Sequence, residues 1–249
     1  MQQHDVGAWL LQETWEEGDE FDVDIGGYHI FRHNALRGEN GRQHLFKGVA
    51  IILSPTFYQA WHAAGSLSPI TTNSNDEFSG RIICLKLKFT SFDSRGKCIK
   101  GKYISIALMS VYFPCNDRQH ERFCNVFDSV LADINLNTQV IVGSDINARI
   151  GTWTSDEHKQ VLGPYGIARS NTRGETLVHI LGSNEMRVEN TFYNHTPEDY
   201  VTYTSIPTNF HPAGISSMHD IFACSQSLHK RIHDCKAVPH GAISDHKAV

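Results

Sequence analysis

Two apolar runs on either side of an amphipathic segment constrain the fold of this chain more than any other feature. Residues 103–113 are almost continuously apolar and end at Pro114, and residues 140–142 form a brief apolar run that leads into Ser144 and Asp145. Runs of this kind are typical of strands buried on both faces of a sheet. The sequence therefore predicts two interior strands joined by a crossover.

The crossover has the spacing of a helix. Its apolar residues recur every three or four positions, at Phe123, Val126, Phe127, Val130, Leu131 and Ile134. Asn116 or Asp117 can cap its start. A second helix is predicted from Thr172 to Gly182, because Thr172 and Glu175 match a capping box and glycine commonly ends a helix.

Shorter segments elsewhere are predicted to be strands. They cover residues 6–12, 49–53, 82–89, 200–204, 218–224 and 237 onward. Strands that alternate with helices favour an α/β fold. No internal repeat, low-complexity tract or linker interrupts the chain, so one domain spanning residues 1–249 is expected.

Composition excludes several classes of protein. With 40% apolar and 20% charged residues, the chain has the makeup of a folded domain. Its longest apolar runs fall short of the roughly 18 residues that a membrane span requires, and the N-terminus lacks the pattern of a secretory signal. Six cysteines without a CxxC pair are expected to stay reduced. We therefore expect an intracellular protein, nuclear or cytoplasmic.

Charge is unevenly distributed. The net charge of −5 argues against a protein that coats nucleic acid by bulk attraction. An acidic segment spans residues 13–24 and is interpreted as a solvated loop. Arg95, Lys97, Lys100 and Lys102 crowd a predicted hairpin tip, for which a solvated loop and a functional basic patch both remain open.

Polar side chains recur where the apolar strands end. Glu13 follows the first strand, Asp145 and Asn147 follow residues 140–142, and Asp245 and His246 lie near the end of the chain. Strand ends are where α/β sheets build active sites, because a rigid strand positions a group that the following loop leaves exposed. Each position alone is weak evidence, since a single polar residue after a strand is usually a surface residue.

In combination and in order, these segments form a specific pattern. The motifs are Leu11-Gln12-Glu13-Thr14, Val111-Tyr112-Phe113-Pro114, Gly143-Ser144-Asp145-Ile146-Asn147-Ala148, Thr202-Tyr203-Thr204, His219-Asp220-Ile221-Phe222 and Ser244-Asp245-His246. The chain resembles the endonuclease/exonuclease/phosphatase superfamily over essentially its whole length. Within the superfamily, the chain is similar to the branch of retrotransposons that lack long terminal repeats, on the evidence of residues 161–166, 171–175 and 188–191. That branch includes cellular proteins of the craniofacial development protein 2 type.

The resemblance implies a deoxyribonuclease I-like, four-layered α/β sandwich that hydrolyses DNA phosphodiesters with Mg²⁺ or Mn²⁺. Glu13 is the expected metal ligand, since hard cations prefer carboxylate oxygens. Asp145 matches the aspartate that positions or deprotonates water or assists the leaving group. Asn147 is expected to face the phosphate beside Asp145 if the segment is extended.

The remaining site residues also follow from the resemblance. His246 should donate a hydrogen bond to the phosphate, and Asp220 should orient and charge the imidazole of His246. Asp245 would lie beside the metal, and Tyr112 and Thr202 match positions whose hydroxyls contact phosphate. A strand aspartate such as Asp220 is costly to bury without a partner. In this branch nicking primes reverse transcription, so a reverse transcriptase domain is expected in a longer parent protein.

Two departures from the family pattern concern the ends of the chain. The family's first strand normally precedes the glutamate motif by some thirty residues, whereas Glu13 lies almost at the start. The chain also stops three residues after His246. A fragment truncated at both ends is therefore expected, with unpaired strand edges. His219 and Ser144 stand where isoleucine and glycine are commoner.

Other interpretations remain open. The same fold serves phosphatases and phosphodiesterases that act on non-DNA substrates, and a catalytically inactive relic would still bind nucleic acid. Cysteine and histidine also recur near the end of the chain, at Cys224, His229, His233 and Cys235, and such residues can ligate zinc. Their spacing matches no common zinc module, and Ser144 does not lie in a nucleophile elbow.

Overall fold

The computed structural model describes residues 6–249 except 17, 35–46, 74–76, 93–96, 135, 154, 157, 206, 208–213 and 239–245. The chain divides into two compact units. The first comprises residues 1–112 and 134–141, and the second comprises residues 113–133 and 142–249. In the part of the chain that is described, no helix is long and apolar enough to cross a membrane.

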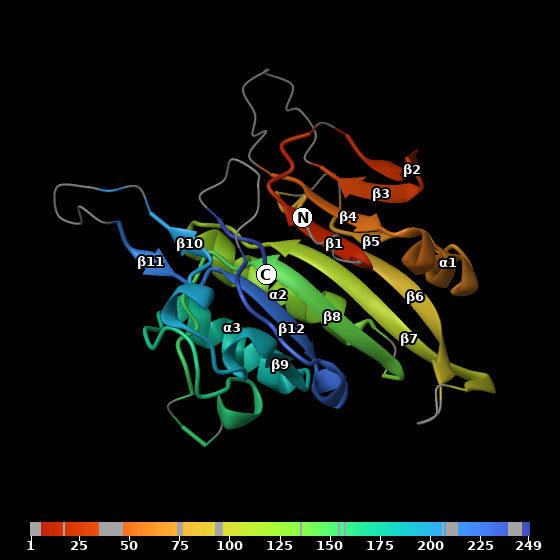
Figure 1. The fold of residues 1–249 in the computed structure, drawn as a ribbon. Coiled ribbons are helices and arrows are strands. Elements are labelled where there is room, and N and C mark those ends of the chain that lie inside the picture. The colour runs from red at the N-terminus through yellow and green to blue at the C-terminus, as the bar shows by residue number, and fades with distance from the viewer. Residues whose placement is uncertain are drawn as a thin grey trace, which may run out of the picture. The chain divides into compact units, whose positions relative to one another are not determined.

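The first unit contains a four-stranded antiparallel sheet (Figure 1). Its strands, in spatial order, are β1 (Ala8–Gln12), β4 (Val49–Leu53), β3 (Tyr28–His33) and β2 (Glu20–Ile25). The central strand β4 is buried along almost its whole length, which explains its continuous apolar sequence. Strand β1 ends next to Glu13 and so positions one of the predicted site residues.

A long hairpin forms the other layer of this unit. Strands β6 (Ile82–Phe92) and β7 (Cys98–Tyr112) pair antiparallel, and β5 (Ile70–Thr71) pairs with β6. Alternate residues of the hairpin pack against the first sheet, and the fully buried members of this core are Phe31, Val49, Ile51, Leu53, Ile83 and Leu85. Helix α1 (Pro55–Ala63) contributes Trp61, which packs edge-to-face on Phe31.

The expectation of a solvated loop at residues 13–24 is wrong for its second half. Residues 20–25 form strand β2, which turns into β3 through Gly26 and Gly27, both with positive φ. The charges of this strand have partners on β3: Glu20 pairs with Arg32, and Asp22 accepts from His29. Cross-strand pairing of opposite charges makes an acidic strand stable at the edge of a sheet.

The second unit is a mixed assembly of strands and helices. Strand β8 (Thr138–Asp145) is divided between the units: its first four residues belong to the first unit and its last four to the second. The second unit also contains β12 (Asp220–Ser225) and β9 (Met186–Val188). Strands β12 and β9 pair antiparallel. Helices α2 (Asp117–Ala132) and α3 (Thr172–Ser183) pack on each other. Short strands β10 (Tyr203–Thr204) and β11 (Ser216–Ser217) form a separate pair.

Both predicted helices are confirmed, with one correction to a cap. The side chain of Asn116 accepts from the backbone of Gln119 at the start of α2, as expected. Helix α3 is instead capped by Asn171, whose Oδ1 accepts from the backbone nitrogen of Gly174 at 3.0 Å. The capping box at Thr172 is therefore wrong, because the preceding asparagine already occupies the cap.

The strand predictions are confirmed in place but not always in length. Strand β7 begins at Cys98 and β8 at Thr138, so both extend beyond the apolar runs that predicted them. The segment from residue 200 is strand only at Tyr203–Thr204. Beyond residue 237, the described residues show an isolated bridge between Val238 and Ala248 rather than a strand.

Thiol reactivity provides a test of this burial. Burial raises the pKa of the Cys84 and Cys124 thiols to about 12, whereas Cys98 and Cys115 are exposed. Because the thiolate is the reactive form, iodoacetamide at pH 8 should alkylate Cys98 and Cys115 and spare Cys84 and Cys124 until the protein is denatured. Peptide mass spectrometry reads out each site, and equal labelling of all four cysteines in the native protein would contradict the fold.

Candidate active site

The carboxyl end of β8 positions an aspartate and an asparagine together. Asp145 is the last residue of the strand and is 3% exposed, and its backbone oxygen accepts from the nitrogen of Phe113 at 2.9 Å. The carboxylate accepts two hydrogen bonds from Asn147, one from its backbone nitrogen at 3.0 Å and one from Nδ2 at 3.3 Å. The carboxylate of Asp145 is thus held in one orientation.

The extended backbone on which Asn147 was expected to point the same way as Asp145 is not found. The strand ends at Asp145, and Asn147 has a φ of 46°, in the left-handed region that non-glycine residues adopt rarely. This turn brings the amide back toward the strand, where Nδ2 also donates to the Phe113 carbonyl at 3.0 Å. The two side chains therefore meet through a strained turn, which is a feature that clusters at functional sites.

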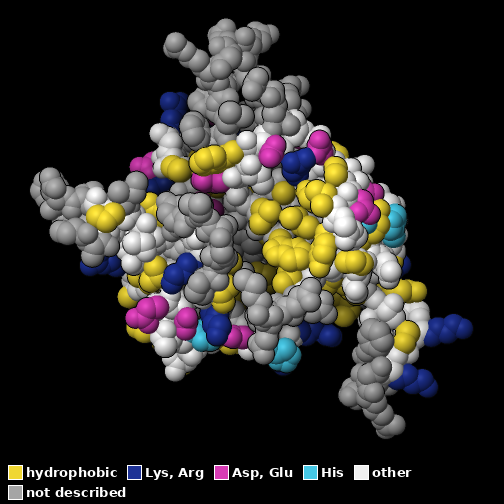
Figure 2. Space-filling view, turned by 45° about the horizontal axis from the view of Figure 1, so that its top comes forward, with side chains coloured by type: hydrophobic (Ala, Val, Ile, Leu, Met, Phe, Trp, Pro, Cys, Tyr) yellow, Lys and Arg dark blue, Asp and Glu magenta, His cyan; other side chains and the backbone are white. Residues whose placement is uncertain are grey.

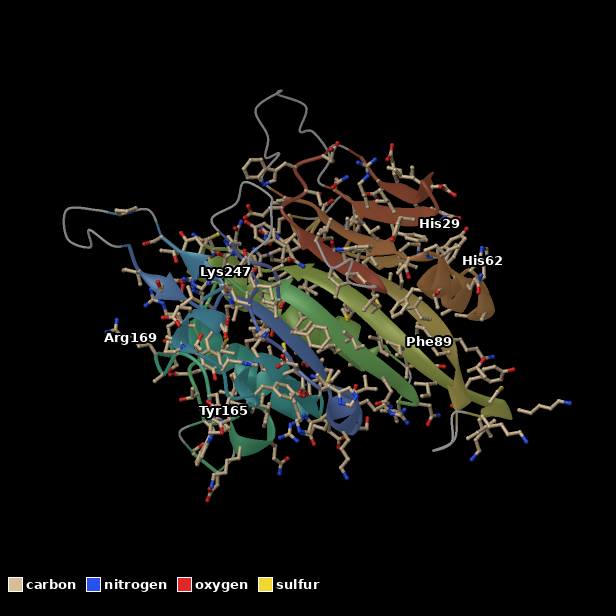
Figure 3. The ribbon with its side chains drawn as sticks, viewed as in Figure 1. His29, His62, Phe89, Tyr165, Arg169 and Lys247 are labelled. Carbon is tan, nitrogen blue, oxygen red and sulfur yellow. The ribbon has the colours of Figure 1, made fainter. Side chains whose placement is uncertain are left out.

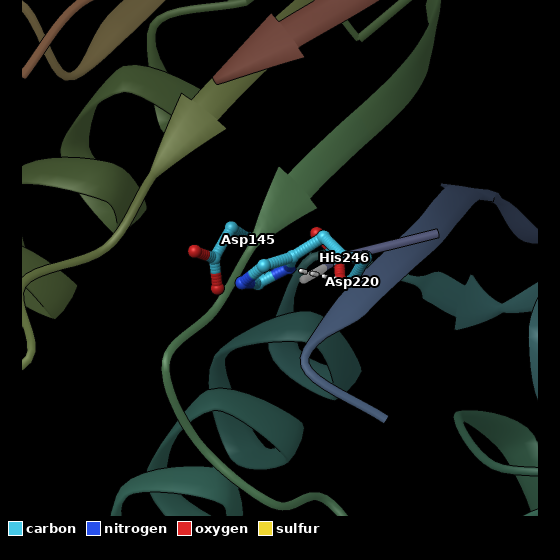
Figure 4. Close-up of side chains that lie close together, drawn as sticks. All are labelled: Asp145, Asp220 and His246. Atoms are coloured by element: carbon cyan, nitrogen blue, oxygen red, sulfur yellow. Dashed lines mark hydrogen bonds and ion pairs between the residues drawn. The ribbon is translucent and has the colours of Figure 1, made fainter. Parts of the chain in front are cut away.

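An imidazole and a second aspartate complete the arrangement (Figure 4). Asp220 begins β12, and its Oδ2 lies 2.8 Å from Nδ1 of His246. The side chains are only 24% exposed for His246 and 16% for Asp220. A carboxylate that accepts from Nδ1–H fixes the orientation of the ring and, when the ring is protonated, leaves Nε2–H to donate to another group.

Asp145, Asp220 and His246 form a group that could hold a metal ion. Each offers one ligand atom, and these atoms lie within 4.8 Å of one another. Two carboxylates and one imidazole suit divalent cations such as Mg²⁺ and Mn²⁺, for which oxygen donors dominate. The donor chemistry thus fits the predicted cofactor, and among the described residues no other such group is found.

Three neighbouring residues hold the Asp220–His246 pair in place. The hydroxyl of Thr202 is buried and accepts from the backbone nitrogens of His219 and Asp220, both at 2.9 Å. The ring of Tyr203 lies between two imidazoles, with centroids 4.8 Å from His219 and 4.8 Å from His246. The contact of Thr202 with substrate stays a prediction, because the structure shows its hydroxyl engaged with backbone.

Sequence reasoning did not assign a role to Tyr203 or His219. Burial lowers the pKa of His219 to about 4, and the positive charges of Arg149 and Arg173 act in the same direction while Asp220 opposes them. His219 is therefore a neutral ring that stacks on Tyr203 at neutral pH. The sequence feature that could have pointed to His219 was the histidine itself, because isoleucine is commoner at this position of the motif.

Two further predicted residues meet in the first unit. The hydroxyl of Tyr112 donates to Oε1 of Glu13 at 2.5 Å, and Tyr112 is 5% exposed whereas Glu13 is exposed. Glu13 has a φ of 54°, so it shares with Asn147 the left-handed conformation. Arg81 lies over the Tyr112 ring and donates to the Tyr112 carbonyl at 3.0 Å. The tyrosine therefore orients the glutamate.

Two residues of the last motif are not placed. Asp245, predicted to lie beside the metal, and Ser244 fall outside the described residues. Lys247 follows His246 and lies in the second unit (Figure 3), where its backbone nitrogen donates to the Thr202 carbonyl at 2.7 Å. This bond and the bridge between Tyr203 and His246 connect the end of the chain to β10.

Ser144 is excluded as a nucleophile by its surroundings. It is 3% exposed, and its buried hydroxyl has no hydrogen-bond partner among the residues that the structure describes. An unpaired buried hydroxyl costs about 1–3 kcal/mol. Ser144→Ala should therefore raise the free energy of unfolding by about 1 kcal/mol in urea titrations. A loss of stability of similar size would show that the hydroxyl has a partner in solution.

The alternative zinc set does not assemble in the structure. His229 lies 3.0 Å from Oε2 of Glu189, and Cys224 donates to Oε1 of the same buried carboxylate at 3.2 Å. Burial raises the pKa of the Cys224 thiol, which disfavours the thiolate that zinc binds. Cys224 and His229 instead stabilise the carboxylate of Glu189.

Close packing of the backbone explains why glycine stands at position 174, within the motif at residues 171–175. A Cβ atom at Gly174 would lie 1.9 Å from the carbonyl oxygen of Arg149. The first turn of α3 therefore packs directly against the loop that follows Asn147. Asn171 strengthens the same contact, because its Oδ1 accepts from the backbone nitrogen of Arg149 at 3.2 Å.

A sequence profile described as endonuclease-reverse transcriptase matches residues 106–249, which is more than half of the chain. The matched segment contains Tyr112, Asp145, Asn147, Asp220 and His246. The chain belongs to the endonuclease-reverse transcriptase family. A sequence comparison with curated proteins returned no match.

Solved structures agree with this family. The endonuclease domain of TRAS1, a telomere-specific non-LTR retrotransposon, is 16% identical with a TM-score of 0.53, and the match covers 90% of this chain and 78% of that one. An AP endonuclease from Leishmania major is 15% identical with a TM-score of 0.65, covering 98% and 77%. An AP endonuclease from Archaeoglobus fulgidus is 16% identical with a TM-score of 0.57, covering 97% and 86%. At such identities the likeness concerns the fold.

These findings confirm the predicted superfamily, its retrotransposon branch and the α/β sandwich fold. The similarity to craniofacial development protein 2 and the single-domain expectation stay predictions. Membership of the endonuclease-reverse transcriptase family identifies the chain as a phosphodiester hydrolase. The roles of individual residues, the identity of the metal and the substrate are matters for proposal.

Proposed function

We propose that the chain is a Mg²⁺- or Mn²⁺-dependent endonuclease that nicks DNA. The observation that carries the proposal is the group of Asp145, Asp220 and His246, whose ligand atoms lie within 4.8 Å of one another at the end of β8 and the start of β12. The family, described as endonuclease-reverse transcriptase, and the similarity to the endonuclease domain of a retrotransposon support nucleic acid as the substrate. A longer parent protein with a reverse transcriptase domain belongs to the same proposal.

Each residue has a task that its contacts suit. Asp145, held by Asn147, orients the attacking water or takes its proton. His246, with Asp220 on Nδ1, donates a hydrogen bond from Nε2 to a phosphate oxygen. Asn147 keeps the Asp145 carboxylate in place, since its amide nitrogen donates to Asp145 and to the Phe113 carbonyl.

Metal binding is assigned to carboxylates. Glu13, oriented by the Tyr112 hydroxyl, is proposed as a metal ligand, and Asp245 as a residue beside the metal. A bound divalent cation supplies positive charge that offsets the charge of the scissile phosphate. Tyr112 and Thr202 are kept as candidates for contact with phosphate oxygens, although each hydroxyl has a protein partner.

The experiment is conversion of supercoiled plasmid to open circles. The chain is assayed beside its Asp145→Ala variant, and circular dichroism checks that both are folded, so that weak folding is not mistaken for an inactive site. We expect open circles from the chain in Mg²⁺ or Mn²⁺ and none in chelator. Binding without nicking by the folded chain in either metal would support the inactive relic, and cleavage of non-DNA phosphoesters alone would support the phosphatase alternative.

A further inference from the structure

The distal half of the β6–β7 hairpin has an unusual charge. Its described residues, 86–92 and 97–103, carry five lysines and no acidic side chain, a formal charge of +5, while the chain as a whole carries −5. The other 235 residues therefore carry −10. A local concentration of positive charge on an acidic protein is the electrostatic signature of a site for a polyanion. We name residues 86–92 and 97–103 the basic arm.

The backbone of the basic arm projects the lysines of β7 into solvent, whereas Lys86 and Lys88 on β6 are half-buried. Thr90 pairs with Tyr103, whereas Phe92 pairs with Cys98. An advance of two residues along β6 therefore lies opposite an advance of five residues along β7, so β7 bulges between these two pairs. Lys100 and Lys102 lie on this bulge and are exposed, on either side of Gly101, which has a φ of 78°. A bulge re-aims side chains and leaves its extra residues outside the ladder.

An aromatic ring accompanies these charges. Tyr103 is 52% exposed, and Nζ of Lys88 lies 4.2 Å from the centre of its ring. Phe89 lies within this region on β6 (Figure 3). The hairpin runs toward the lower right of Figure 1, and dark blue side chains project at the lower right of the face shown in Figure 2. Lysines beside an exposed aromatic ring suit the phosphates and sugars of nucleic acid.

The basic arm is too far from the Glu13–Tyr112 pair to belong to that site. Tyr103 and Tyr112 are nine residues apart on one continuous strand, which corresponds to roughly 30 Å at about 3.3 Å per residue. The same length of duplex DNA spans about nine base pairs. The arm would therefore meet the backbone well outside the bond that is cut.

We propose that the basic arm is a second contact site for the phosphate backbone of duplex DNA, independent of sequence. The inference rests on the proposed function for the choice of DNA as the polyanion. Phosphate contacts by lysine add affinity without reading bases, and each contact steepens the dependence of affinity on salt. The arm would hold the substrate while the active site engages it.

The test compares two triple variants with equal changes in charge. The arm variant carries Lys97→Ala, Lys100→Ala and Lys102→Ala, and the control carries Lys159→Ala, Lys230→Ala and Lys236→Ala, at exposed positions of the second unit. Binding of a labelled 40-base-pair duplex is followed by fluorescence anisotropy in chelator from 50 to 200 mM salt. The readout does not depend on cleavage, so it separates this inference from the proposed function.

We expect the arm variant to bind about tenfold more weakly at 50 mM salt, with a salt slope reduced by about 2–3, since each lost contact removes about 0.9. The control should change neither quantity appreciably. In nicking assays the arm variant should be impaired on the 40-base-pair duplex. It should not be impaired on a 12-base-pair duplex cut at its centre, because the six base pairs on either side are fewer than the roughly nine that separate the cut from the arm. Equal affinity and equal slope in the two variants would overturn the proposal.

Discussion

Replacing Asp145 by asparagine should lower the single-turnover rate of nicking by about 10²–10⁴-fold, the usual contribution of a positioned acid or base. The substitution keeps the shape of the side chain but removes the negative charge at the end of β8. The buried carboxylate is held by Asn147 and belongs to a group that could hold a metal ion, so we propose that its charge serves both the water and the cation. Quenched-flow or gel-based nicking in saturating Mg²⁺ measures the effect.

The matched control for this prediction is Asp156→Asn. Asp156 is an exposed carboxylate of the same unit, paired with Lys159 at its surface. It should leave the nicking rate within about twofold of the parent, since exposed ion pairs contribute little. If Asp145→Asn nicks as fast as Asp156→Asn while both remain folded, the assignment of Asp145 to the reaction is wrong.

Asp220→Asn and His246→Gln should each lower the nicking rate by about 10²–10³-fold, and the double variant should be no slower than the slower single variant. The reason is that Asp220 acts through His246, whose Nδ1 it binds at 2.8 Å. Without the carboxylate, the imidazole loses both its orientation and the charge that stabilises its protonated form. Removing both partners therefore removes one function.

A second histidine–aspartate pair provides the control. His195 and Asp234 lie 2.6 Å apart at a partly exposed place in the same unit. His195→Gln and Asp234→Asn should change stability slightly and the nicking rate little. Strictly additive losses in the Asp220/His246 cycle would contradict the pairing, because they would mean that the two side chains act separately.

Much of the fold could be predicted because its strands are buried on both faces. The apolar runs that became β4, β7 and β8 and the periodic helix α2 are signals that burial produces directly. Strand β2 was missed because its alternation is weak and its charges suggested a loop, although Arg32 and His29 pair with them. Helix α1 was missed because its start, Ser54 before Pro55, leads into only nine residues.

The candidate site could be predicted in its residue types but not in its local geometry. Spacing along the chain cannot reveal that Asn147 and Glu13 take left-handed backbone conformations, since these depend on contacts made elsewhere. Nor can it show that the Thr202 hydroxyl is occupied by two backbone nitrogens, or that Tyr203 lies between His219 and His246. Such details come from tertiary packing.

The most direct test is a double-mutant cycle of Glu13→Gln and Asp145→Asn, with single-turnover nicking measured as a function of Mn²⁺ concentration. The two carboxylates are proposed to serve one metal-dependent step, so the double variant should be about as slow as the slower single variant. Glu13→Gln should also need more Mn²⁺ for its half-maximal rate. Additive losses together with an unchanged Mn²⁺ requirement would contradict it.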